Sequence, residues 1–320
     1  MTKTLTTLLI IFSSTITFSQ VIVKETESSQ SLIEAYISPL GESIGQGLNN
    51  GWFNTAKPHK LGGFDLTFNF NIVSLPNSSL VFDPNEIEGF SSNSLSPTLL
   101  GKGDGATITY DHPSGFSETF KMPDQAVQLN NLPIPTLNLG VGLIKETELN
   151  VRYIPNTNYD IKMLGQGSVN LLGIGLKHNL MQWIPLASKL PIHLSIQGAY
   201  TTLNTSFEIK SDNIDQMVEL NTVAYNYNLI LSKKLLMLTP YLSIGYSNSI
   251  TNFKSDIKFN LGDGLNAVEF NIPNDIDFTN LGLMNYSAGI RVQLALLSLH
   301  ISQSFSEYKT TSIGAGISFR

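Results

Sequence analysis

The chain has 320 residues, a formal net charge of −6 and no cysteine. Disulfides and thiolate metal sites are therefore excluded, and an acidic balance without a basic stripe argues against nucleic acid as a partner. Charged residues make up 14% of the chain, below the roughly 25% of ordinary soluble domains. Asn, Ser, Thr, Gly and Gln take their place, and this composition favours a membrane β-barrel.

Residues 1–19 have the features of a secretory signal peptide. Lys3 lies in a short basic start, an apolar stretch follows from Leu8 to Phe12, and Ser19 precedes a candidate cleavage point. A short hydrophobic strand is the alternative interpretation. Nothing later approaches the 18 or so consecutive apolar residues of a transmembrane helix, so we expect an exported protein without a helical anchor.

Residues 20–61 predict a short helical plug or hatch that lies in or beneath the mouth of a barrel. Leu32, Ile33, Tyr36 and Ile37 have helical spacing, and several glycines follow them. A loosely ordered periplasmic arm is the alternative. The candidate plug residues are Glu34, Glu42, Trp52, Lys57, His59 and Lys60.

Residues 62–320 are dominated by alternation of apolar and polar residues, which is typical of half-buried strands. In GGFDLTFNFNI, for example, the apolar residues from Phe64 to Ile72 share one face and the polar residues share the other. The polar faces carry mostly Asn, Ser, Thr and Gly, and the segments are about as long as membrane-crossing strands. We therefore expect apolar faces toward lipid and polar faces toward a lumen. A soluble β-protein is the competing fold.

Arg291 illustrates this register, since it interrupts the apolar run MNYSAGIRVQLALL but shares its face with Ser287, Gly289 and Gln293. Charges removed from water need partners, so we expect the lumen charges to pair with each other or with the plug, where Glu34, Glu42, Lys57 and Lys60 are candidates. The polar residues expected to line the lumen are Asp65, Asn69, Glu148, Arg152, Lys177, His193, Gln197, Asn226, Asn228, Arg291, Gln293 and His300.

The connections alternate in length, as in barrels with short periplasmic turns and long outer loops. This order places the start of the first strand and the end of the last strand on the short-turn side. About ten strands are clear, and a hairpin around residues 112–115 would give twelve. The predicted fold is an all-β, transmembrane, antiparallel up-and-down barrel of about 10–14 strands with a helical N-terminal plug. Long connections are expected near 74–135, 155–166, 206–216 and 252–283, and short ones at 145–147, 233–234 and 297–298.

Aromatic residues on the strands predict girdles at the two membrane interfaces; ordinary strand aromatics are the alternative. The candidates are Trp183, Tyr225, Tyr227, Tyr241, Tyr246, Tyr286 and Phe319.

Two stretches, SPLGESIGQGLNNGWFNTAKPHKLGGFDLTF (38–68) and GIGLKHNLMQWIPLASKLPIHLSIQGAY (173–200), together with the last strand, resemble an uncharacterised family of exported Gram-negative outer-membrane barrels. The helix-then-barrel order is distantly similar to FadL-type transporters of hydrophobic compounds, which have fourteen strands and an Asn-Pro-Gly start that this chain lacks. The last strand resembles the C-terminal assembly signature of such barrels, although Phe319 is penultimate here. The resemblance implies barrel-assembly machinery as a partner.

Signatures of catalysis are scarce. The five histidines have no metal-ligand spacing, and neither a nucleophile elbow nor a phosphate loop occurs. His193 and His300 each have a serine two residues along, but on polar faces, which disfavours a lipid-facing hydrolase. We therefore expect no enzyme activity, no cofactor and no metal site.

Two functions remain. The first is an outer-membrane channel or transporter for a small or hydrophobic or amphiphilic solute. The second is a structural or interaction barrel with a filled lumen that displays long outer loops and transports nothing. The lipid bilayer is the expected surrounding in both cases.

Overall fold

The structure is a computed structural model that describes residues 22–23, 27–111, 115, 117–124, 130–161, 165–185, 190–211, 214–255, 258–261, 268–271 and 275–319. The signal peptide expected over residues 1–19 lies outside these residues. In the described part of the chain, no helix combines the length and the apolar character needed to cross a bilayer.

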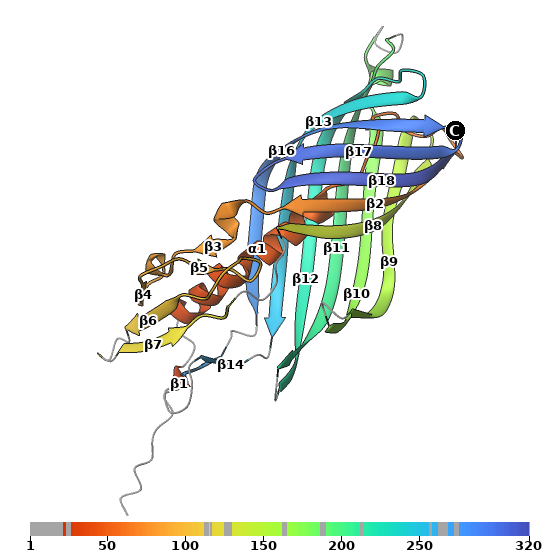
Figure 1. The fold of residues 1–320 in the computed structure, drawn as a ribbon. Helices are drawn as coiled ribbons and strands as arrows, with labels where there is room; N and C mark the ends of the chain where they lie inside the picture. Colours follow the sequence, from red (N-terminus) through yellow and green to blue (C-terminus); the bar gives the residue numbers. More distant parts are fainter. Residues whose placement is uncertain are drawn as a thin grey trace, which may run out of the picture.

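Ten antiparallel strands of the described chain close into one barrel (Figure 1). Each pairs with the next along the sequence, and the last strand pairs with the first over their full lengths. The predicted fold class is confirmed, with ten strands. They are β2 (Phe64–Ser74), β8 (Asn131–Gly142), β9 (Thr147–Ile161), β10 (Gly165–Asn179), β11 (His193–Ser211), β12 (Ile214–Ser232), β13 (Leu238–Ser255), β16 (Ile276–Leu294), β17 (Leu297–Phe305) and β18 (Lys309–Phe319).

The period-two pattern sorts side chains between the outside and the inside of the barrel. Along β2, Phe64, Leu66, Phe68 and Phe70 are exposed, whereas the polar residues between them are buried. Strands β8, β10, β13 and β18 alternate in the same way. An apolar exterior around a polar interior is the arrangement of a barrel that spans a lipid bilayer, where closure also satisfies every strand edge.

Two of the predicted long connections are wrong. Strand β9 continues to Ile161, and β11 and β12 stay paired up to Ser211 and Ile214. The residues from Asn156 to Asp160 are polar at almost every position. Along this part of β9, water on both faces removes the need for alternation, so the sequence pattern ends before the backbone pairing does.

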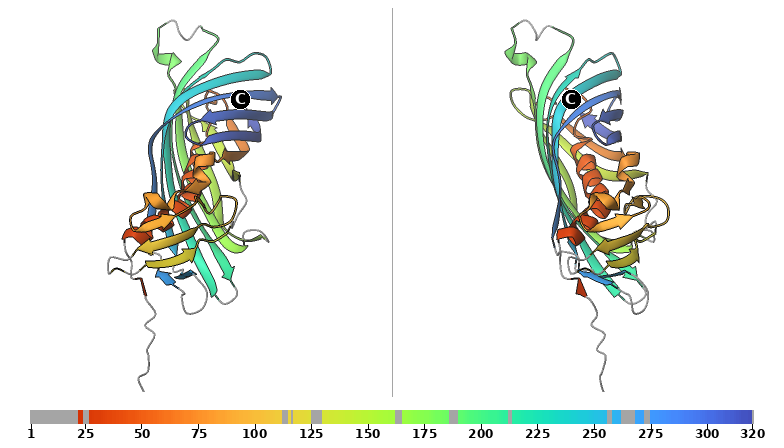
Figure 2. Two further views of the ribbon diagram at one scale, coloured as in Figure 1. Left: turned by 60° about the vertical axis from the view of Figure 1, so that its left-hand side comes forward. Right: turned by 90° about the vertical axis from the view of Figure 1, so that its left-hand side faces the viewer.

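The helix α1 (Glu27–Asn49) enters the barrel from the end that carries the long connections, and its carboxyl-terminal half lies in the lumen (Figures 1 and 2). It packs mainly against β13, β12 and β16. Glycines permit this close approach: a Cβ built at Gly45 would lie 2.0 Å from Ser249 Oγ. Residues 50–63 then leave the lumen at the opposite end, where β2 begins beside the end of β18.

The amino-terminal half of α1 is covered by the long connection between β2 and β8. Leu32 and Tyr36 of the helix share one apolar cluster with Ile108 and Phe120, and Leu99 N–H donates to Tyr36 O at 2.8 Å. The hairpin expected around residues 112–115 lies here, in a sheet of order β4-β6-β7 outside the barrel, and so adds no barrel strand. Its strands are β4 (Phe90–Ser92), β6 (Thr107–Asp111) and β7 (Ser117–Lys121).

The remaining elements are short. One small sheet has the order β1-β15-β14, another pairs β3 with β5, and the described connections contain three 3₁₀ helices. The strands are β1 (Ile22–Val23), β3 (Val81–Phe82), β5 (Ser96–Pro97), β14 (Lys258–Leu261) and β15 (Val268–Asn271), and the 3₁₀ helices are η1 (Asn77–Ser79), η2 (Pro84–Glu86) and η3 (Met181–Trp183).

The exterior can be tested at Ile301, which is 48% exposed and lies between the outward-facing Ile290 and Ile313. We expect Ile301→Arg to lower the free energy of unfolding by about 2–4 kcal/mol, because the charge would face hydrocarbon. Urea unfolding in liposomes, read by heat-modifiable migration in gels, measures this. Ile301→Leu is the control, and equal stability of both variants would contradict the assigned outside.

Candidate functional site

The lumen is crossed by residues 50–61, which join α1 to β2 and are called the plug segment here. Wall side chains hold its main-chain oxygens: Asn138 Nδ2 donates to Gly51 O at 2.7 Å, Gln197 Nε2 to Trp52 O at 3.4 Å, and Ser195 Oγ to Ala56 O at 2.5 Å. These amides and hydroxyls come from β8 and β11. The small polar residues of the alternating strands therefore serve as hydrogen-bond donors to a peptide chain.

Arg152 of β9 is fully buried beside the end of α1. Its Nη1 donates to Leu48 O at 2.7 Å, Nη2 to Asn50 O at 2.9 Å and Nε to Asn138 Oδ1 at 2.9 Å. The guanidinium also lies 4.1 Å from the centre of the Trp52 ring, within the range of a cation–π contact. Because the last carbonyls of a helix carry partial negative charge, Arg152 acts as a cap supplied by the wall.

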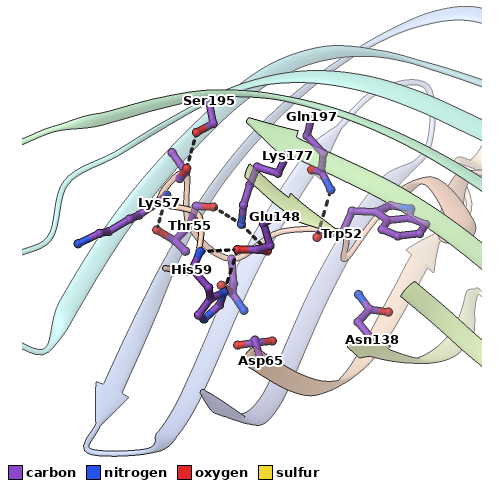
Figure 3. Close-up of polar contacts among 12 residues, drawn as sticks. Trp52, Thr55, Lys57, His59, Asp65, Asn138, Glu148, Lys177, Ser195 and Gln197 are labelled. Carbon is purple, nitrogen blue, oxygen red and sulfur yellow. Dashed lines mark hydrogen bonds and ion pairs between the residues drawn. The ribbon is translucent and has the colours of Figure 1, made fainter. Parts of the chain in front are cut away.

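A second charged group joins the plug segment to the wall through Glu148 of β9 and Lys177 of β10 (Figure 3). Glu148 accepts from Lys177 Nζ at 2.9 Å, from His59 Nδ1 at 2.8 Å and from the His59 backbone N–H at 2.9 Å. His59 Nε2 lies 3.0 Å from Ser318 Oγ. A carboxylate only accepts hydrogen bonds, so Nδ1 carries the proton in this contact. Lys177, Glu148 and His59 form a buried ionic cluster in which only His59 belongs to the plug segment.

Trp52 fills the lumen next to two wall glycines. A Cβ at Gly173 would lie 2.9 Å from the Trp52 ring, and a Cβ at Gly175 would lie 3.1 Å from it. The indole N–H donates to Leu48 O at 3.1 Å. The glycines of the GIG stretch thus leave room for the one large ring of the plug segment that is almost fully buried.

Arg291 lies nearer the barrel end where β18 finishes. Its Nη1 donates to Asn54 Oδ1 at 3.0 Å, and its Nη2 is 3.7 Å from Asp65 Oδ2, which is an ion pair without a hydrogen bond. His300 is its cross-strand neighbour and is buried. Among the described residues, Arg291 Nε and Nη2 and both ring nitrogens of His300 have no hydrogen-bond partner.

Little space remains beside the plug segment. Two cavities that touch it have volumes of about 20 and 10 Å³, so each holds about one water molecule. A larger cavity of about 500 Å³ lies at the barrel end where β18 finishes, and a groove of about 250 Å³ lies on the outer face of the wall across β9 to β12. The described part of the chain therefore forms a plugged barrel with a water-accessible space between the plug segment and the end of β18.

The structure brings most of the residues expected in the lumen together around the plug segment. Ten of them are buried on the inner face: Asp65, Asn69, Glu148, Arg152, Lys177, Gln197, Asn226, Asn228, Arg291 and His300. His193 and Gln293 are half-buried at the mouth near the end of β18. Asn138 and Ser195 were not among the residues expected to line the lumen, although both lie on the polar faces of alternating strands.

The lumen charges pair with each other and with the plug segment, as expected, but among the described residues none of the four candidate plug side chains takes part in an ion pair with them. Glu34 accepts from Gln30 one helical turn away, and Glu42 accepts from Tyr308 at 2.6 Å. Lys57 and Lys60 are exposed at the mouth. His59 and main-chain carbonyls take the place expected for these four side chains, because a helix end offers acceptors that do not depend on residue type.

The aromatic residues lie mostly outside. Trp183, Tyr227, Tyr246, Tyr286 and Phe319 are exposed, and Tyr225 is half-buried beside Tyr227.

Tyr241 is the exception among the predicted girdle residues. It is 2% exposed and packs inside the barrel against Phe53, with ring centres 6.0 Å apart. It shares strand parity with Ser243 and Gly245, so the two-residue period directs it inward whatever its ring prefers. Tyr200, which pairs with Tyr225 across β11 and β12, is exposed and joins the outer aromatic residues instead.

The site shows no arrangement of reactive groups. Among the residues that the structure describes, no three His, Asp or Glu side chains are grouped to hold a metal ion. Ser195 donates to the Ala56 carbonyl and is not poised beside a histidine as an activated nucleophile would be. The geometry supports binding of a peptide segment in the lumen, and the absence of enzyme activity stays a prediction.

Comparisons with known structures return other barrels at low similarity. The translocator domain of the autotransporter NalP from Neisseria meningitidis is 9% identical with a TM-score of 0.33, over 92% of this chain and 100% of that one. The outer-membrane protease OmpT from Escherichia coli is 8% identical with a TM-score of 0.33, over 80% and 96%. The toluene transporter TodX from Pseudomonas putida is 8% identical with a TM-score of 0.27, over 80% and 89%. These values carry no statement about activity.

Comparison of sequences gives a clearer result. No curated protein matches the chain. The profile of DUF6588, described as a family of unknown function, matches residues 1–319. The chain belongs to this family.

Proposed function

We propose that this protein is an outer-membrane channel or transporter for a small or amphiphilic solute, with the plug segment as its gate. The observation that carries the proposal is the chemistry of the plug contacts. Hydrogen bonds and a buried ionic cluster hold residues 50–61, and only two large apolar rings, Trp52 and Phe53, accompany them.

Polar contacts of this kind suit a plug segment that can move out of the lumen. Replacing a buried ion pair by apolar groups is often neutral or stabilising, so a permanently closed lumen would not need Glu148, Lys177 and Arg152. When a polar segment is displaced, water takes over its hydrogen bonds, which lowers the cost of opening. The cavity of about 500 Å³ at the end of β18 gives water access to the plug segment from that side.

The membrane assignment rests on the exterior of the barrel. Exposed Leu, Ile, Phe and Tyr side chains surround it, and such a surface is stable only against lipid or detergent. The predicted signal peptide supports export, and the C-terminal strand with Phe319 supports handling by barrel-assembly machinery. Since the short connections are expected on the periplasmic side, the end of β18 faces the periplasm and the β4-β6-β7 sheet faces the outside of the cell.

A structural or interaction barrel is the second candidate. One observation favours it: the connection between β2 and β8 packs on α1 through an apolar cluster that continues into the barrel wall. A cap of this kind would present a folded surface at the outer end without any transport.

A disulfide tether separates the two candidates, since the chain has no cysteine of its own. Thr55 Oγ1 and Ser232 Oγ are 3.3 Å apart, so Thr55→Cys with Ser232→Cys would fix the plug segment to β12. We expect oxidation of this variant to abolish swelling of liposomes in arabinose, and a reductant to restore it.

The control for the tether is a staple within the wall. Ser168 Oγ and Ser206 Oγ of β10 and β11 are 2.7 Å apart, and a disulfide there leaves the plug segment untouched. Swelling should be insensitive to its oxidation. If the untethered protein passes neither arabinose nor a small amphiphile such as indole, transport is ruled out and the structural candidate stands.

Arg152 gives an independent test of the gate. Arg152→Ala removes three hydrogen bonds to neutral oxygens at the end of α1, a cost of about 1–3 kcal/mol for each oxygen that stays buried and unpaired. We expect a higher open probability in planar bilayers than for the wild type. Heat-modifiable migration must show a folded barrel, and an unchanged conductance in that folded variant would contradict the gating role.

A further inference from the structure

The cavity of about 500 Å³ at the end of β18 is called the C-terminal vestibule here. Its volume lies within the range of small-molecule sites. The plug segment lies on one side of this vestibule. The β12–β13 turn, the β16–β17 turn, the start of β11 and the last residues of β16 and β18 lie around the rest of it. Its lining residues include Lys57, His59, Lys60, His193, Lys234 and Arg291.

The charges in this vestibule have one sign. Four cationic side chains reach it from three parts of the chain: Lys57 and Lys60 from the plug segment, Lys234 from a turn, and Arg291 from β16. None of its described lining residues is Asp or Glu. Since the whole chain has a net charge of −6, this concentration of positive charge runs against the average of the molecule and raises the local density of anions.

The nearby carboxylates are already engaged. Asp65 accepts from Thr67 at 2.5 Å and faces Arg291 with its other oxygen at 3.7 Å. Glu148 is held by Lys177 and His59. Glu146, in the β8–β9 turn, accepts from the Asn179 amide. None of these groups neutralises the three lysines of the vestibule.

Arg291 adds a buried positive charge at the base of the vestibule. It is 4% exposed and lines the vestibule. Its Nε and Nη2 lack hydrogen bonds within the described chain, but they are closed off from the cavity, and Nη2 faces Asp65 Oδ2 at 3.7 Å. The guanidinium therefore acts on an anion in the cavity through its charge, and the lysine ammonium groups are the donors that can reach the anion.

We propose that the C-terminal vestibule binds an anionic phosphate or carboxylate group, with Lys57, Lys60 and Lys234 as the direct ligands and Arg291 as a buried charge that strengthens binding. The exposed Leu296 and Phe319 at its rim also allow a lipid headgroup to be the source of the anion. Anion binding at this site does not require that the barrel conducts, so its test is independent of the test of the gate.

The test uses the full-length protein in a nonionic, phosphate-free detergent. Inorganic phosphate is titrated by calorimetry, and native mass spectrometry compares retention of phosphatidylglycerol with that of phosphatidylcholine. We expect saturable binding of one of the two anions. Arg291→Gln and the pair Lys57→Gln with Lys60→Gln should each weaken it about tenfold or more, the loss expected when positive charge near the anion is removed. Added NaCl should weaken it further.

The control is Lys309→Gln, a cation removed at the opposite end of the barrel, at the start of β18. The exposed lysine pair keeps the test decisive if Arg291→Gln fails to fold. Phosphate binding lost in the variants supports a free anion, and selective phosphatidylglycerol retention lost in the variants supports a lipid headgroup. If the protein binds neither phosphate nor phosphatidylglycerol, or if Lys309→Gln weakens binding as much as the vestibule variants do, the proposal is overturned.

Discussion

The contact between Arg152 and the last carbonyls of α1 is the interaction on which the interior depends. A guanidinium removed from water is costly unless its donors are met. Here its hydrogen bonds go to neutral oxygens, two of them at the negative end of a helix dipole. The helix has no basic residue in its own last turn. The wall therefore provides the positive charge for the helix end, and the helix end provides the hydrogen-bond acceptors for Arg152.

This contact also explains the direction of the chain through the barrel. Only a helix whose carboxyl end points into the lumen can offer its carbonyls to Arg152. The helix therefore enters from the end with the long connections, and the plug segment must cross to the other end before β2 begins. Glycines at the contacts, such as Gly45 against Ser249 and Gly173 against Trp52, give the backbone and the ring the room they need.

Much of this arrangement follows from the sequence because a two-residue period leaves little freedom. Once Phe64 faces out, Asp65 faces in, and the same parity places Arg291 and His300 inside. Parity also explains the error at Tyr241, which was assigned by residue type against the period. The end of β9 could not be predicted, since its polar residues from Asn156 to Asp160 show no alternation. The partners of Arg152 in the plug could not be predicted, because every residue has a main-chain carbonyl and the sequence does not show which carbonyls act as acceptors.

The plugged lumen can be measured directly with single cysteines in this cysteine-free chain. Ala56 is fully buried within the plug segment, whereas its neighbour Lys57 is exposed in the C-terminal vestibule. A membrane-impermeant maleimide should label Lys57→Cys rapidly and Ala56→Cys at least about a hundredfold more slowly, as expected for a site that reacts only through local opening. Equal labelling rates at the two positions would show that residues 50–61 do not occupy the lumen.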